Sequence, residues 1–183
     1  MNTSEDTLKQ EWRDLLFSVR RSVRYHQHRV AFFDRLNKTI RFVALVSGAS
    51  VITTALAEAG AGWVKFSAVV VALISALDLV VNTEGGIRRH LELVGRFLNL
   101  EKRMVQAGMA TRELLLALAA ERLEIEAGEP PVLRVLDCVC HNELLRAMGY
   151  TDNKDAPDFA RIAWYQRLLA DFFDVRAHAV KWG

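Results

Sequence analysis

Apolar residues recur at helical spacing along the first forty residues and predict one long helix. They are Leu8, Trp12, Leu15, Leu16, Val19, Val23, Val30, Phe33 and Ile40, with one gap at His26. Either Thr3 or Ser4 can cap this helix, and no Pro or Gly interrupts it before Gly48. We therefore expect it to continue directly into the apolar segment that follows.

Two apolar runs come next and predict a transmembrane hairpin. Residues 42–57 contain no charged side chain, and residues 63–81 are interrupted only by Lys65 and Asp78. With the first run extended to Ile40, each approaches the ~20 residues that cross a bilayer. The short, glycine-containing connector makes the two helices antiparallel. A hairpin buried in a soluble bundle is the alternative, but the remaining chain offers little apolar surface to cover two such helices.

The rest of the chain shows helical spacing only, and no strand pattern is visible. After Gly85 and Gly86, a helix is predicted from Ile87 to Val105, with a break at Gly108. The next predicted helix is capped by Thr111 and ends at Gly128. Two more helices follow, one over residues 131–148 that Gly149 stops and a final one over residues 164–173. The expected fold is thus an all-α membrane protein. One transmembrane hairpin is accompanied by long cytoplasmic helices that form a bundle.

Basic residues gather on both outer sides of the hairpin although the net charge of the 183-residue chain is only +2. The flanks carry Arg29, Arg35 and Lys38 before the hairpin, and Arg88 and Arg89 after it. The positive-inside rule then places both termini in the cytoplasm. The predicted regions are an N-terminal cytoplasmic helix (1–39), the hairpin (40–81) and a C-terminal cytoplasmic helical region (82–183). These basic flanks are expected to contact anionic lipid headgroups, and no nucleic-acid partner is expected.

Little in the sequence indicates catalysis or metal binding. Cys138 and Cys140 are too few and too close for a disulfide framework, which fits a reducing compartment, and no signal peptide is recognisable. Cys138 and His141 share a helix face but lack two further zinc ligands, whereas His26 and His28 point to different faces. Cys140 is expected to be a buried apolar residue. No phosphate loop or nucleophile motif occurs, so the chain is expected to be no enzyme and to need no cofactor.

Small residues line both predicted spans. Ala44 and Gly48 lie four apart in the first, and Ala68, Ala72 and Ala76 lie four apart in the second. Small side chains let membrane helices approach closely, which drives their association in lipid. They could pack the two helices of one hairpin or pack hairpins of different subunits, and the sequence leaves both open.

Asp78 is the acidic residue within the second span. An acid there costs ~2.5–3.5 kcal/mol on insertion scales and normally faces a partner, a pore or water. Counting from the hairpin turn places Asp78 within about one helical turn of Arg41 at the cytoplasmic boundary. The first interpretation is therefore a salt bridge between Asp78 and Arg41, within or between hairpins. The other is a ring of Asp78 carboxylates at the inner mouth of an oligomeric pore, which would favour cations.

The order of several short motifs resembles the SLATT domain, a two-transmembrane effector domain associated with SMODS nucleotidyltransferases and SLOG nucleotide sensors. The motifs are Tyr25 to Arg29, Phe32 to Leu36, Ser75 to Val80, Arg88 to His90, Glu121 to Glu126, Glu129 to Pro131, Cys140 to Glu143, and Trp164 with Tyr165. They cover most of the chain. None is specific alone, and their order carries the resemblance.

The resemblance implies a homo-oligomeric, pore-forming effector that depolarises the inner membrane in a bacterial anti-phage or conflict system. The sequence shows no nucleotidyltransferase or SLOG sensor, so the implied partners are the lipid bilayer, further copies of the chain and a separately encoded nucleotide-signalling or sensor protein. A membrane-anchored scaffold or regulator that binds a cytosolic partner is the alternative. A soluble helical adaptor is the third hypothesis.

Overall fold

The protein is described by a computed structural model over residues 3–56, 61–108, 111–151 and 159–182. Its elements are α1 (Thr3–Leu56), α2 (Ala61–Val81), α3 (Thr83–Ala107), α4 (Arg112–Glu126), α5 (Arg134–Ala147), β1 (Ala160–Arg161), α6 (Trp164–Leu169), the 3-10 helix η1 (Ala177–Ala179) and β2 (Lys181–Trp182). Helix accounts for 81% of the described residues, so the predicted all-α class is confirmed. The expectation of no strands is wrong for two short segments.

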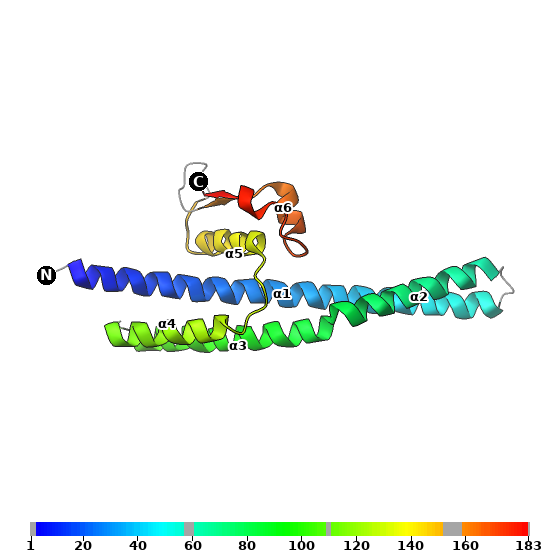
Figure 1. The fold of residues 1–183 in the computed structure, drawn as a ribbon, viewed down its shortest axis with the longest axis horizontal. Helices are drawn as coiled ribbons and strands as arrows, with labels where there is room; N and C mark the ends of the chain where they lie inside the picture. Colours follow the sequence, from blue (N-terminus) through cyan, green and yellow to red (C-terminus); the bar gives the residue numbers. More distant parts are fainter. Residues whose placement is uncertain (1–2, 57–60, 109–110, 152–158, 183) are drawn as a thin grey trace. The chain divides into compact units, whose positions relative to one another are not determined.

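The chain forms two compact units (Figure 1). The first unit joins residues 1–28 to residues 90–183, and the second unit comprises residues 29–89. Helix α1 contributes to both, because it runs uninterrupted over 54 residues. The predicted connector of the hairpin, residues 57–60, lies outside the described residues.

The main core of the first unit lies among α1, α3 and α4. Its buried members are Leu15, Val19, Val23, Leu93, Phe97, Leu100, Met104, Leu115, Leu118 and Ile125. The members on α1 recur every fourth residue, which gives one apolar stripe of a helix. Thr111 caps α4, its Oγ1 accepting from the backbone N–H of Leu114 at 3.3 Å, as predicted.

A smaller core lies where α5 packs against α1 and against the C-terminal lobe, which we define as residues 159–182. It contains Tyr25, Val135, Leu136, Val139, Cys140 and Ala170. In the lobe, β1 and β2 pair antiparallel, with Ala160 opposite Trp182. The Asn142 side chain of α5 holds β1 through two hydrogen bonds to the Ala160 backbone, at 2.7 and 2.9 Å.

Three predicted helix limits change in the structure. The helix expected after Gly86 already begins at Thr83, because Asn82 adopts a left-handed conformation (φ 48°) and its Oδ1 accepts from the Gly85 N–H at 3.2 Å. The helix expected over 131–148 spans only Arg134–Ala147. The final helix, α6, ends at Leu169, so residues 172 and 173 lie beyond it. Gly108 (φ 66°) and Gly149 (φ 90°) follow α3 and α5 as predicted.

Leu118→Ala is expected to lower the free energy of unfolding by about 2–5 kcal/mol, because it leaves a cavity among α1, α3 and α4. Leu116→Ala is the matched control on the same helix: Leu116 is exposed, so the change should stay within about 0.5 kcal/mol. Urea titration of the detergent-solubilised chain, followed by circular dichroism, measures both. Equal losses in the two variants would contradict this assignment of the core.

Candidate functional site

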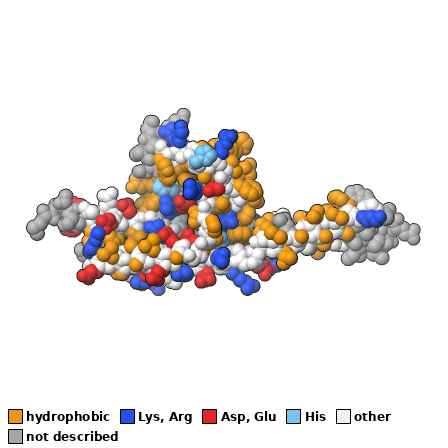
Figure 2. Space-filling model, viewed as in Figure 1, with side chains coloured by type: hydrophobic (Ala, Val, Ile, Leu, Met, Phe, Trp, Pro, Cys, Tyr) orange, Lys and Arg blue, Asp and Glu red, His pale blue; other side chains and the backbone are white. Residues whose placement is uncertain are grey.

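Large apolar side chains of the second unit are exposed rather than packed. They are Phe42, Leu45 and Val46 on α1, and Phe66, Val69, Leu73, Leu79 and Val80 on α2. Within the described residues, one helical stretch (Ala68–Ala107) contains an 18-residue window long and apolar enough to cross a membrane, and only 6% of that window is buried. The side chains of residues 50–57, in the first predicted span, lie outside what the structure describes. In Figure 2 the exposed apolar atoms are the orange ones.

Asp78 and Arg41 have different partners in the chain. The Asp78 carboxylate accepts from the Thr83 hydroxyl at 2.8 Å, and Thr83 is buried. Arg41 pairs with Glu84 and donates to the Asn37 side chain at 3.1 Å. The predicted salt bridge between Asp78 and Arg41 is therefore not formed within this chain. The sequence alone does not reveal the partners of Asp78 and Arg41, because they depend on the left-handed conformation of Asn82 between α2 and α3.

The predicted basic flank lies entirely in the second unit. The Arg29 guanidinium stands over the Phe32 and Phe33 rings, 5.0 and 4.8 Å from their centroids. Arg35 donates to the Ala31 carbonyl, and Lys38 pairs with Asp34 at 2.7 Å, all within one exposed stretch of α1. Arg88 and Arg89 are exposed on α3. The basic flank therefore places several Arg and Lys side chains at the surface of the second unit.

The outer ends of the two apolar helices meet in the second unit. Arg41 of α1 pairs with Glu84, which follows α2 by only three residues. Nearby, a Cβ on Gly86 would lie 3.0 Å from atoms of the Phe33 ring, so a larger residue there would push against that ring. Residues 41 and 84 are therefore close in space although 43 positions separate them in sequence.

The small residues of the two predicted spans are open in this single chain. Ala68, Ala72 and Ala76 are exposed on α2, and Ala44 is partly exposed on α1. A Cβ added to Gly48 would meet nothing within 4 Å. These positions therefore leave space for a neighbour that the described part of the chain does not supply.

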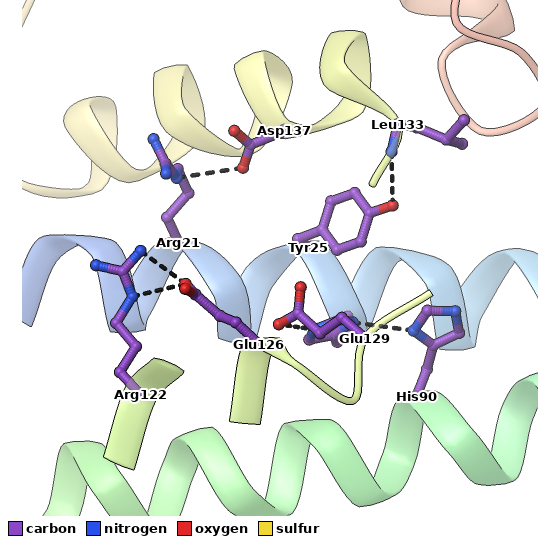
Figure 3. Close-up of polar contacts among 9 residues, drawn as sticks. Arg21, Tyr25, His90, Arg122, Glu126, Glu129, Leu133 and Asp137 are labelled. Carbon is purple, nitrogen blue, oxygen red and sulfur yellow. Dashed lines mark hydrogen bonds and ion pairs between the residues drawn. The ribbon is translucent and has the colours of Figure 1, made fainter. Parts of the chain in front are cut away.

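A buried histidine pair lies in the first unit, and the sequence reasoning missed it (Figure 3). The Nδ1 atoms of His26 on α1 and His90 on α3 are 2.9 Å apart, and both residues are nearly inaccessible to solvent. His26 Nε2 lies 3.1 Å from a Glu129 carboxylate oxygen. Because two Nδ1 atoms face each other, one ring must donate and the other accept.

Further polar contacts connect α5, and the residues just before it, to the part of α1 that carries His26 (Figure 3). The Tyr25 hydroxyl accepts from the Leu133 N–H at 3.0 Å, and Arg21 pairs with Asp137 at 3.2 Å. Burial raises the pKa of the Asp137 carboxyl, and the Arg21 charge offsets part of that shift. The histidine pair and these contacts therefore join helices α1, α3 and α5 with the segment after α4.

The residues weighed for metal binding are used in packing. His28 pairs with Glu143 at 2.9 Å, whereas His26 contacts Glu129. The two histidines therefore point to different partners, as their spacing on the helix predicted. The His141 ring makes edge contacts with Phe17 and Trp182, with centroids 5.1 and 5.0 Å apart. Over the described ranges, no group of three or more His, Cys, Asp or Glu side chains could hold a metal ion. Cys140 is fully buried, which confirms its predicted role as a small apolar residue.

His90→Phe is expected to destabilise the first unit by about 1–3 kcal/mol, because the ring volume is kept while the buried Nδ1 of His26 loses its partner. His178→Phe, at an exposed histidine of the C-terminal lobe, serves as the control and should change stability little. The midpoint of chemical unfolding reports the difference. A neutral His90→Phe variant would show that the pair has no structural role.

The thiols should alkylate slowly while the protein is folded. Burial raises the pKa of both cysteines, most strongly that of Cys140, and only the thiolate reacts. Mass spectrometry after N-ethylmaleimide treatment near neutral pH should show unmodified Cys140 and slow labelling of Cys138, with both labelled after denaturation. The Cys140→Ser variant assigns the sites. Rapid native labelling of Cys140 would contradict its burial.

No known protein family, curated protein or solved structure matches this chain. The SLATT resemblance therefore stays a prediction, and the function is argued from the geometry of the two units.

Proposed function

We propose that the chain is a homo-oligomeric membrane effector that crosses the bilayer with a two-helix hairpin over residues 40–81 and opens a conductive path. The observation that carries this proposal is the exposure of the apolar window within Ala68–Ala107, of which 6% is buried. Water would solvate such a surface poorly, at roughly 25 cal/mol for each Å² of apolar area. Lipid is the solvent that would remove this cost.

The charge distribution supports a cytoplasmic position for both termini. The Arg41–Glu84 pair brings the outer ends of the two apolar helices to one level. Lys38 before the hairpin and Arg88 after it are exposed beside that level. Positive residues are retained on the cytoplasmic side of bacterial membranes, so we assign the protein to the inner membrane.

Two exposed features support assembly of several copies. The small face Ala68, Ala72 and Ala76 on α2 could seat a second hairpin in lipid. On α3, Leu91, Leu98 and Val105 are exposed and recur every seventh residue, as in the seam of a coiled coil. One hairpin cannot enclose water, so conduction requires such an assembly.

The resemblance to SLATT domains would add the biological setting. It suggests an effector of a bacterial conflict system that depolarises the membrane when a separately encoded nucleotide-signalling or sensor protein activates it. The exposed heptad stripe of α3 is a surface through which activation could change subunit packing. The biological setting and the activating partner are inferred only from the order of the motifs that resemble SLATT domains.

One contact favours a second candidate function, a membrane-anchored scaffold without a pore. The carboxylate of Asp78 accepts a hydrogen bond from Thr83 of its own chain, so it has a partner without facing a pore. In that case the hairpin only anchors the helices that bind a cytosolic partner. The two candidates differ in whether purified protein moves ions.

Reconstitution into liposomes with a K⁺ gradient and a potential-sensitive dye tests the proposal. Wild-type protein should dissipate the potential, and Asp78→Asn should lower the preference for K⁺ over Cl⁻ because it removes the proposed ring of charge. Glu124→Gln, at an exposed acid on α4, is the matched control and should leave selectivity unchanged.

Light scattering in detergent gives the subunit number as a multiple of 20.7 kDa. Leu98→Glu should reduce both the oligomer mass and the ion flux, since it places a charge in the exposed stripe of α3. Inserted, oligomeric protein that leaves the potential intact would favour the scaffold. Protein that stays monodisperse in detergent-free buffer would defeat both membrane proposals.

A further inference from the structure

The C-terminal lobe exposes a row of large apolar side chains that its own core does not use. Trp164 is 79% exposed, Leu168 70%, Phe172 55% and Phe173 65%. Figure 2 shows hydrophobic side chains gathered over the flank of the lobe where α6 lies. Such a concentration on a folded surface usually marks a site of contact with another molecule or with a membrane.

Two members of the row, Trp164 and Leu168, belong to α6, whose other face is already packed. Gln166 of α6 is buried, its amide donating to the carbonyls of Val175 and Arg176 at 3.0 and 3.1 Å. Ala170 is buried against α5. These contacts hold the backbone of the lobe while Trp164 and Leu168, one helical turn apart, remain outside. Trp164 and Leu168 therefore face away from the core, and Phe172 and Phe173 are exposed just after the same helix.

The charge of the lobe narrows the choice of occupant. Arg167, Arg176 and Lys181 are exposed, and Arg167 is adjacent to Leu168 of the row. Residues 159–182 contain two acids: Asp174 is exposed and accepts from the Val135 N–H at 2.9 Å, and Asp171 is half-buried. The exposed basic residues of the lobe outnumber its acids, and a surface that combines such an excess with exposed Trp, Leu and Phe fits the boundary between anionic headgroups and acyl chains.

We propose that the docking row, Trp164, Leu168, Phe172 and Phe173, binds the anionic face of a lipid bilayer, with the exposed basic side chains of the lobe supplying the attraction to the headgroups. The indole ring suits this position because its apolar body and polar N–H match the two sides of the interface. The inference goes beyond the proposed function, since docking of the lobe requires neither a pore nor an oligomer. It gives the first unit a lipid contact of its own.

A full-length chain with Trp164 as its only tryptophan tests the proposal in reconstituted vesicles. The other three are replaced as Trp12→Phe, Trp63→Phe and Trp182→Phe. Vesicles of phosphatidylglycerol with brominated acyl chains should quench Trp164 emission and shift it to the blue, and brominated phosphatidylcholine should quench it much less. A companion chain that keeps only Trp12, which packs on the main core, should be quenched by neither.

Charge variants of the Trp164 chain separate docking from insertion of the hairpin. Arg167→Gln with Lys181→Gln should reduce the ratio of docked to undocked lobe at low salt by about fivefold for each residue removed. Arg13→Gln with Lys102→Gln removes the same charge from exposed positions of α1 and α3 and should leave quenching unchanged. Leu168→Gln with Phe173→Gln should weaken quenching in both lipids.

Three results would overturn the docking proposal. The first is unquenched Trp164 in protein that co-floats with the vesicles. The second is equal quenching in the two lipids, which would exclude an anionic surface. The third is a blue shift that depends on protein concentration in detergent, which would assign the row to a second copy. Ion flux is measured separately, so failure of the pore leaves this test unaffected.

Discussion

The central constraint on this protein is the solvent required by an apolar helix that its own chain leaves uncovered. Helix α2 exposes Leu79, Val80 and most of its described apolar side chains, and the first unit contains two small cores that already use their own apolar residues. A helix can remain folded in lipid because its backbone hydrogen bonds are satisfied within the segment. The second unit is therefore the described part of the chain whose large apolar side chains lack cover.

The first unit is organised differently, around polar groups that must satisfy one another away from water. His26, His90 and Glu129 come from three separate parts of the chain and meet in a region closed to solvent. Each would be costly to bury alone, so their mutual hydrogen bonds select one arrangement of α1, α3 and the segment after α4. The Tyr25 hydroxyl also links α1 to the start of α5, because it accepts a hydrogen bond from the Leu133 backbone N–H. This polar network favours one packing arrangement of the helices, while the leucine-rich core provides most of the buried apolar surface.

Helix α1 gives residues to both units, so one uninterrupted element meets two environments. Its N-terminal part provides Val19 and Val23 to the main core, and its later part carries the exposed Phe42 and Leu45. The docking row of the lobe would add a second contact with lipid, so that membrane composition could influence the first unit as well.

The sequence by itself determined the all-helical class, the apolar segments, the cap at Thr111 and the breaks at Gly108 and Gly149, because helical periodicity, capping and left-handed glycines are local properties. It also indicated that His26 and His28 would have different partners. Only the tertiary structure decided that His26 meets His90, that Arg41 pairs with Glu84 rather than Asp78, and that the chain ends in a small paired sheet. Those outcomes depend on groups far apart in sequence, or on the left-handed conformation of Asn82, and neither leaves a periodic signal.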